Sequence, residues 1–137
     1  KRVMSPLQSD TNIILETDLP PKDFRDFLEV FESDRIKANY DVGNSASLGF
    51  NLKEEFREIG TWIENIHVKD RKFNGSTVPL GKGDVNFDLF FSELKNIGYK
   101  KDLIIQGARR DTVETPIESC KSYLNFVNQY LDKYSFI

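Results

Sequence analysis

Four polar side chains that can bind a metal ion or move a proton each follow a short apolar run of the sequence. They are Glu16, Asp41, His67 and Gln106. Carboxylates and an imidazole are ligands of divalent ions such as Mn²⁺, Mg²⁺, Co²⁺ and Zn²⁺, and an amide oxygen is a weaker neutral ligand. Each residue alone also has an ordinary explanation, as a solvated loop start, a turn cap or a partly buried polar group. Their equivalent placement favours one shared site.

The runs that precede these residues are typical of short β-strands, and the segments between them have helical periodicity. We predict strands over residues 12–17, 36–40, 63–68 and 103–106, a turn-rich segment over 41–44 and a loop over 73–84. We predict helices from Pro20-Pro21 to about Phe31, over Leu52–Ile59, around Phe87–Leu94 before Gly98, and from about Val113 to Tyr134. On the last helix the expected apolar stripe is Ile117, Cys120, Leu124, Val127 and Leu131. The pattern is βα repeated four times.

Strands that alternate with helices imply a parallel sheet. Four such units form either a small open sheet with helices on both faces or half of an eight-stranded barrel, which typically needs about 250 residues. In both architectures ligands bind where the parallel strands end. We therefore expect one domain over residues 1–137, with an irregular lead-in over 1–11.

Composition narrows the class of function. The chain has 137 residues, a formal net charge of −3 and a pI of about 5.2, which argue against a nucleic-acid partner. Its apolar runs fall short of the roughly 18 residues that would cross a membrane, and residues 1–7 do not resemble a signal peptide. One cysteine, Cys120, fits a reducing compartment, so we expect a cytoplasmic protein.

Several motifs together resemble the xylose-isomerase-like barrel superfamily. They are Leu15-Glu16, Tyr40-Asp41-Val42-Gly43-Asn44, Asn65-Ile66-His67-Val68-Lys69-Asp70 and the run from Val78 to Phe87. Their order and spacing are similar to strands five to eight of that family, above all to hexulose-6-phosphate isomerase and pentulose-5-phosphate 3-epimerase relatives. The resemblance covers residues from about 12 to 110. It implies the C-terminal half of a (β/α)8 barrel.

The resemblance also implies a metal-dependent sugar or sugar-phosphate isomerase or 3-epimerase that acts through an enediolate. The family holds its metal with Glu, Asp, His and a final Glu, which correspond here to Glu16, Asp41, His67 and Gln106. The two Glu positions, Glu16 and Gln106, are the catalytic pair that moves the proton next to the carbonyl. Gln106 departs from the family, because an amide neither accepts nor delivers a proton at neutral pH. Loss of one general acid or base often lowers the rate about 10²–10⁴-fold.

Other residues in these motifs are candidates for binding the substrate. The resemblance places Asn44 where the family has a substrate-contacting or metal-shell residue, and Lys69 and Lys72 are candidates to meet a hydroxyl or phosphate. Asp70 either orients Lys69 or caps the loop. Further basic residues near the last strand are Arg109 and Arg110. The Gly81-x-Gly83 pair is a weak phosphate-binding signal.

Alternative functions remain open at this point. A half-barrel without chemistry of its own, as a relic or an assembly partner, is favoured by Gln106 and by the missing four strands. A phosphodiesterase similar to endonuclease IV would need extra Asp and His ligands, which residues 73–83 lack. A phospho-acceptor receiver domain would need an acidic cluster at the first strand. Because four βα units leave two open strand edges, we expect either a homodimer that completes the barrel or a missing N-terminal half.

Overall fold

The computed structural model describes residues 11–108 and 115–136. The strands are β1 (Ile13–Leu15), β2 (Ile36–Asp41), β3 (Ile63–Val68), β4 (Asp70–Arg71), β5 (Thr77–Val78) and β6 (Leu103–Ile105). The helices are α1 (Pro21–Glu29), α2 (Val42–Leu48), α3 (Leu52–Ile59), the 3₁₀ turn η1 (Gly60–Trp62), α4 (Phe87–Asn96) and α5 (Pro116–Lys133).

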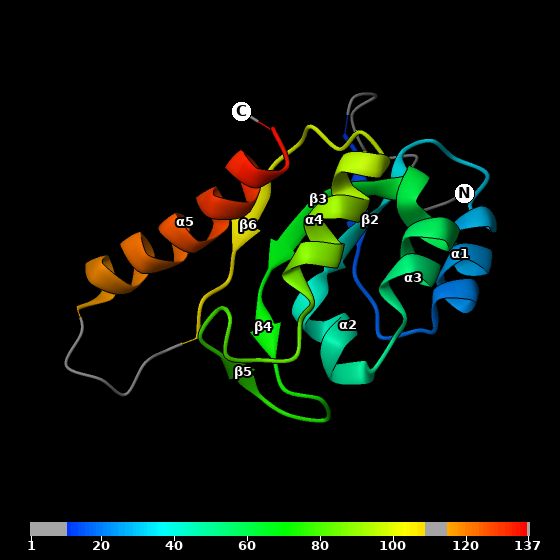
Figure 1. Cartoon of the computed structure of the whole chain (residues 1–137). Coiled ribbons are helices and arrows are strands. Elements are labelled where there is room, and N and C mark those ends of the chain that lie inside the picture. The colour runs from blue at the N-terminus through cyan, green and yellow to red at the C-terminus, as the bar shows by residue number, and fades with distance from the viewer. Residues whose placement is uncertain (1–10, 109–114, 137) are drawn as a thin grey trace.

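Four of the strands form one parallel sheet, in the order β1-β2-β3-β6 (Figure 1). Each strand therefore lies next to the one that precedes it along the chain. A doubly wound open sheet would change direction at a switch point, whereas a barrel keeps this consecutive order. The order favours the predicted half-barrel over the open sheet, and β1 and β6 are its two edges.

Helices α1, α3, α4 and α5 cover one side of this sheet, as Figure 1 shows. The sheet presents its apolar side chains to them, including Ala38 and Tyr40 of β2 and Ile66 of β3, all of which are buried. Tyr40 packs its ring against Phe56 of α3 and Phe90 of α4. Because side chains alternate along a strand, the residues between these apolar positions face the opposite side of the sheet.

The opposite side of the sheet is polar at its centre. Asn39 and Asp41 of β2 lie there beside Asn65 and His67 of β3, with which they are paired in register. At the two edges the same face carries exposed aliphatic side chains, such as Ile104 of β6, which is 45% exposed. In a closed barrel this face would line the interior.

Two expectations about local structure are wrong. Residues expected as a turn-rich segment after Asp41 form helix α2, whose small residues Gly43, Ser45 and Ser47 are buried and show no apolar periodicity. The expected loop over 73–84 contains β5, which pairs antiparallel with β4. The segment after Asp41 is helical because the Asp41 carboxylate accepts a hydrogen bond from Asn44 N and caps the first turn.

The apolar stripe expected on the final helix is also wrong in part. Ile117, Cys120 and Leu124 are exposed, whereas Tyr123 and Val127 are buried. The helix packs through its aromatic residues instead: Phe126 meets Phe87 of α4 edge to face, and Tyr130 stacks on Phe91 of α4. Large rings that meet partner rings decide the buried face more strongly than an aliphatic series. The expected start at Val113 and the lead-in over residues 1–10 lie outside the described residues.

Side chains or a glycine cap ends of α3, α4 and α5, and of these caps only Gly98 was expected from the sequence. Asn51 and Asn86 cap α3 and α4, Thr115 and Glu118 form a capping box at α5, and Gly98 follows α4 with a φ of 67°. Within the described residues, no helix is long and apolar enough to span a membrane.

Candidate metal and catalytic site

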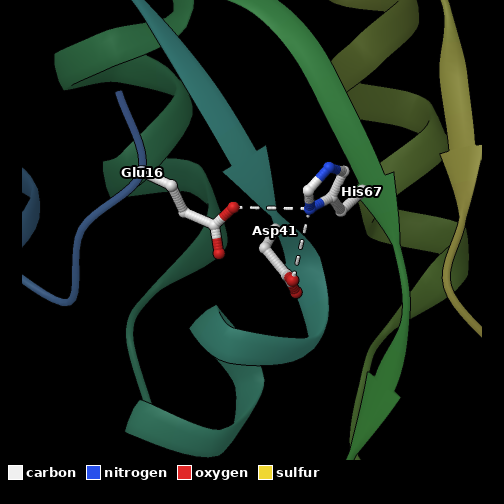
Figure 2. A group of neighbouring side chains, drawn as sticks. All are labelled: Glu16, Asp41 and His67. Carbon is white, nitrogen blue, oxygen red and sulfur yellow. Dashed lines mark ion pairs between the residues drawn. The ribbon is translucent and has the colours of Figure 1, made fainter. Parts of the chain in front are cut away.

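Three of the four residues singled out at the strand ends converge on one point. Glu16 follows β1, Asp41 ends β2 and His67 lies near the end of β3. Their ligand atoms all lie within 4.8 Å of one another. In Figure 2 the three side chains point toward a common centre, with His67 Nδ1 at 3.3 Å from Glu16 Oε2 and 3.8 Å from Asp41 Oδ2.

Gln106 reaches the same group from the fourth strand. Its backbone N–H donates to Val68 O and continues the β3–β6 pairing, and its side-chain Nε2 lies 3.0 Å from His67 Nδ1. The amide oxygen sits opposite this nitrogen, so a half turn about the last side-chain bond would aim Oε1 at the same point. Gln106 is therefore placed to serve as a neutral oxygen ligand.

Each residue of the motif Asp41-Val42-Gly43-Asn44 has its own structural role. Asp41 has a side chain only 2% exposed; Oδ1 accepts from Asn44 N at 2.8 Å, and Oδ2 faces His67. Val42 is buried in the core. A Cβ on Gly43 would lie 2.9 Å from Lys69 Cγ, so only glycine lets the start of α2 approach β3 this closely. The helix cap and the ligand position thus share one carboxylate.

Lys69 brings a positive charge into contact with Asp41. Its Nζ lies 3.1 Å from Asp41 Oδ2 and 3.3 Å from Asn44 Oδ1, and its side chain is 18% exposed. The ammonium offsets part of the repulsion between the two carboxylates. Lys69 and Asn44 lie beside the cluster and both contact other protein groups, and their expected contacts with a substrate stay a prediction.

The structure does not bring Lys72 to this group. Its ammonium pairs with Asp84 at 3.3 Å, and both side chains are about half exposed. Arg109 and Arg110 lie outside the described residues.

Asp70 caps the loop rather than orienting Lys69, and this accounts for the glycine pair. The Asp70 carboxylate is 1% exposed and accepts from Gly81 N, Gly83 N and Val85 N at 2.8–3.2 Å. A Cβ on Gly83 would lie 1.9 Å from Asp70 Oδ1. These N–H groups are used within the chain, so the loop does not form the phosphate cradle that the glycine pair suggested.

Three site residues were missed by sequence reasoning: Asn39, Asn65 and Arg71. Asn39 donates to Glu16 Oε2 at 2.5 Å and accepts from Asn65 Nδ2 at 2.7 Å, while Arg71 donates to Asn44 Oδ1 at 2.8 Å. A signal for Asn39 exists in the sequence, because it lies two residues before Asp41 and so faces the same side of β2. Arg71 carries no comparable signal.

The donor set fits a divalent cation. Two carboxylates, an imidazole and an amide from four adjacent strands match the oxygen and nitrogen ligands of Mn²⁺, Co²⁺, Zn²⁺ or Mg²⁺. The fold is that of a barrel-type α/β protein, because its parallel strands follow one another in order and a layer of helices covers them. Its candidate site lies at the carboxyl ends of the strands.

The family follows from comparison with known proteins. Residues 12–123 match the family described as xylose isomerase-like TIM barrel, and the chain belongs to this family. It is 26% identical to the uncharacterised protein MJ1311 of Methanocaldococcus jannaschii over 115 residues, which are 81% of this chain and 39% of that protein. The chain thus spans well under two thirds of the length of this relative.

Solved structures show the same fold. A xylose isomerase domain protein from Planctomyces limnophilus superposes with a TM-score of 0.74 at 20% identity, covering 92% of this chain and 48% of that one. An L-ribulose 3-epimerase gives 0.71 at 18% identity, covering 90% and 48%. An IOLI protein with a bound zinc atom gives 0.66 at 19% identity, covering 81% and 43%. The chain therefore corresponds to about half of such a barrel, as predicted.

Proposed function

We propose that this chain carries the catalytic half of a metal-dependent isomerase or epimerase of sugars or sugar phosphates. The observation that supports it best is the convergence of Glu16, Asp41 and His67 at the ends of adjacent strands, in a chain of the xylose isomerase-like family. A zinc-bound protein and an epimerase among the structural neighbours agree with it.

The proposed chemistry assigns different tasks to these residues. Asp41, buried and fixed by its bonds to Asn44 N and Lys69, holds the ion together with His67. Glu16 has a side chain 38% exposed, so it alone of the two carboxylates can also reach a substrate and remove the proton beside its carbonyl. A divalent ion, when bound, would polarise that carbonyl and offset the charge of the enediolate.

Gln106 is compatible with isomerisation but not with two-base epimerisation. Epimerisation at one carbon needs a base on each face, and an amide cannot act as the second base. Transfer of the proton between adjacent carbons on one face needs a single base, and Glu16 can supply it. We therefore favour an aldose–ketose isomerisation over 3-epimerisation for this chain.

Metal binding gives the first test. We expect Mn²⁺ or Zn²⁺ to bind the wild-type chain in calorimetric titration, and Glu16→Ala to weaken binding at least tenfold, because a charged ligand is lost. Asp132→Ala, which removes an exposed carboxylate on α5, is the matched control. Equal affinity of the wild-type and Glu16→Ala chains would rule out this ion site.

A second proposal concerns the other half of the barrel. Within residues 11–108 and 115–136, β1 and β6 each pair with one strand only, and the polar face with its site would line the interior of a closed barrel. We propose that four further strands complete it, supplied by a second copy of the chain or by an N-terminal half. Light scattering should give twice the mass of one chain in the first case; a monodisperse monomer would argue against self-closure.

A non-catalytic half-barrel is the alternative that Gln106 favours. Proton exchange between solvent and pentulose or hexulose phosphates separates the two, because an isomerase catalyses exchange even when little product accumulates. Metal binding without any exchange, in a chain that has a completed barrel, would favour the alternative.

A further inference from the structure

The carboxylate of Glu16 is held by two asparagine amides from different elements. Asn39 of β2 donates Nδ2 to Oε2 at 2.5 Å, and Asn44 of α2 donates Nδ2 to Oε1 at 2.9 Å. Each amide thus binds one oxygen. We propose that Asn39 and Asn44 form an amide clamp, two positioning residues that orient Glu16 toward the ion and the substrate proton. This role rests on the proposed function of the site.

Glu16 needs such support because of where it lies. It follows β1, an edge strand of only three residues, and its side chain is 38% exposed. Holding a glutamate side chain in one conformation costs up to about 2 kcal/mol in lost rotamer freedom. A carboxylate has about four acceptor positions, so two amide bonds leave room for a cation and for a proton. The clamp can therefore order Glu16 without blocking it.

Each amide is itself oriented by a further hydrogen bond. Asn39 is buried, and its Oδ1 accepts from Asn65 Nδ2 at 2.7 Å. Because that oxygen is already engaged, the NH₂ group of Asn39 faces Glu16, and it also lies 3.0 Å from His67 Nδ1. The NH₂ group of Asn39 thus contacts both the proposed base, Glu16, and the imidazole of His67.

The amide of Asn44 is oriented by residues outside the β1-β2-β3-β6 sheet. Asn44 Oδ1 accepts from Arg71 Nη1 at 2.8 Å and from Lys69 Nζ at 3.3 Å. The same guanidinium donates twice to Gly75 O, at 2.7 and 3.1 Å. Arg71 therefore connects the β4–β5 hairpin to Asn44, and through Asn44 to Glu16. Two cations on one amide oxygen leave its NH₂ group as the donor to Glu16.

The first experiment tests the clamp without any metal. Side-chain amide protons that donate to a carboxylate are shifted downfield in ¹H–¹⁵N spectra. We expect the Asn39 and Asn44 NH₂ signals to lie downfield of Asn125, an exposed asparagine on α5, and to move toward it in Glu16→Ala. Signals that stay in place when Glu16 is removed would show that no clamp exists, whether or not the chain binds an ion.

The second experiment tests whether the clamp acts through Glu16. Asn39→Leu and Asn44→Ala should each weaken Mn²⁺ binding about tenfold, since a charge-assisted hydrogen bond that orders the ligand is lost. In the Glu16→Ala background each should change the affinity less than twofold. Asn125→Ala should change nothing in either background.

These outcomes separate the clamp from the proposed function. An equal loss of affinity with and without Glu16 would show that Asn39 and Asn44 do not act through Glu16, and would overturn the proposal. A wild-type chain that binds no Mn²⁺ would contradict the ion site, while the amide signals would still decide whether the clamp forms. Asn44→Ala changes a partly exposed position on α2, so it remains informative if the buried Asn39→Leu variant fails to fold.

Discussion

Glu55 should make the stability of this chain depend on pH in a way that one substitution removes. The carboxyl lies on α3, is 5% exposed, and accepts hydrogen bonds from Tyr40 Oη at 2.8 Å and from Ser45 Oγ. Burial raises the pKa of Glu55 from 4.5 to about 7, and the two hydrogen bonds oppose this shift only in part. Burial also raises the pKa of Tyr40 well above its ordinary value, so Tyr40 remains a donor.

The sign of the effect follows from proton binding. Between the unfolded pKa of 4.5 and the folded pKa of about 7, the folded chain binds more protons at Glu55 than the unfolded chain does. Its contribution to stability is therefore fully present below pH 4.5 and is lost as the pH rises through about 7. The loss amounts to about 3 kcal/mol, because each tenfold change in proton affinity is worth about 1.4 kcal/mol.

Glu55→Gln tests this reasoning, because glutamine resembles the protonated acid and can still accept from Tyr40 and Ser45. Urea unfolding of both chains at several pH values from 4 to 9 gives the difference in the free energy of unfolding. We expect near equality at the acid end and a more stable Glu55→Gln chain at pH 8. A difference that does not change with pH would mean that Glu55 has the same pKa in the folded and unfolded chains, and it would refute this reasoning.

Two further substitutions have clear expected results. Gly83→Ala should destabilise the chain by about 2–4 kcal/mol in urea unfolding, since the new methyl group would displace the buried Asp70 carboxylate. Gly60→Ala is the control, because its methyl group meets only Ile97, at 3.4 Å, and its free energy of unfolding should be within about 1 kcal/mol of that of the wild-type chain. Gln106→Glu should raise the affinity for Mn²⁺, because it adds a charged ligand beside His67; unchanged affinity would place Gln106 outside the ion site.

Short apolar runs in the sequence are sufficient to predict the parallel sheet. They predict β3 over 63–68 without error and β1, β2 and β6 to within two residues at either end, but they do not predict β4 and β5. Helix α2 was missed, since its buried residues are small and polar rather than apolar at helical spacing. The buried face of α5 was missed because it depends on ring contacts with α4, which come from 30 to 40 residues away in the chain.

At the candidate site, sequence position predicts the clustered side chains better than the residues that contact them. Glu16, Asp41 and His67 each mark the end of a strand, so parallel pairing brings them together. Arg71 reaches Asn44 only because the β4–β5 hairpin folds back against α2, and no local pattern contains that contact. Lys72, the residue that follows β4, pairs instead with Asp84.

The charges around the site give Gln106 a consequence beyond the loss of a base. Glu16 and Asp41 contribute two formal negative charges, Lys69 contributes one positive charge at 3.1 Å from Asp41, and Arg71 contributes another at 2.8 Å from Asn44, so these four side chains together are formally neutral. A divalent ion would leave them with two net positive charges, where a second glutamate would leave one. An enediolate carries negative charge that its substrate lacks, and a site with positive charge to spare stabilises that state more than the ground state. Under the proposed function, glutamine at position 106 would therefore weaken the hold on the ion and favour an anionic intermediate, which agrees with the proposed one-base isomerisation.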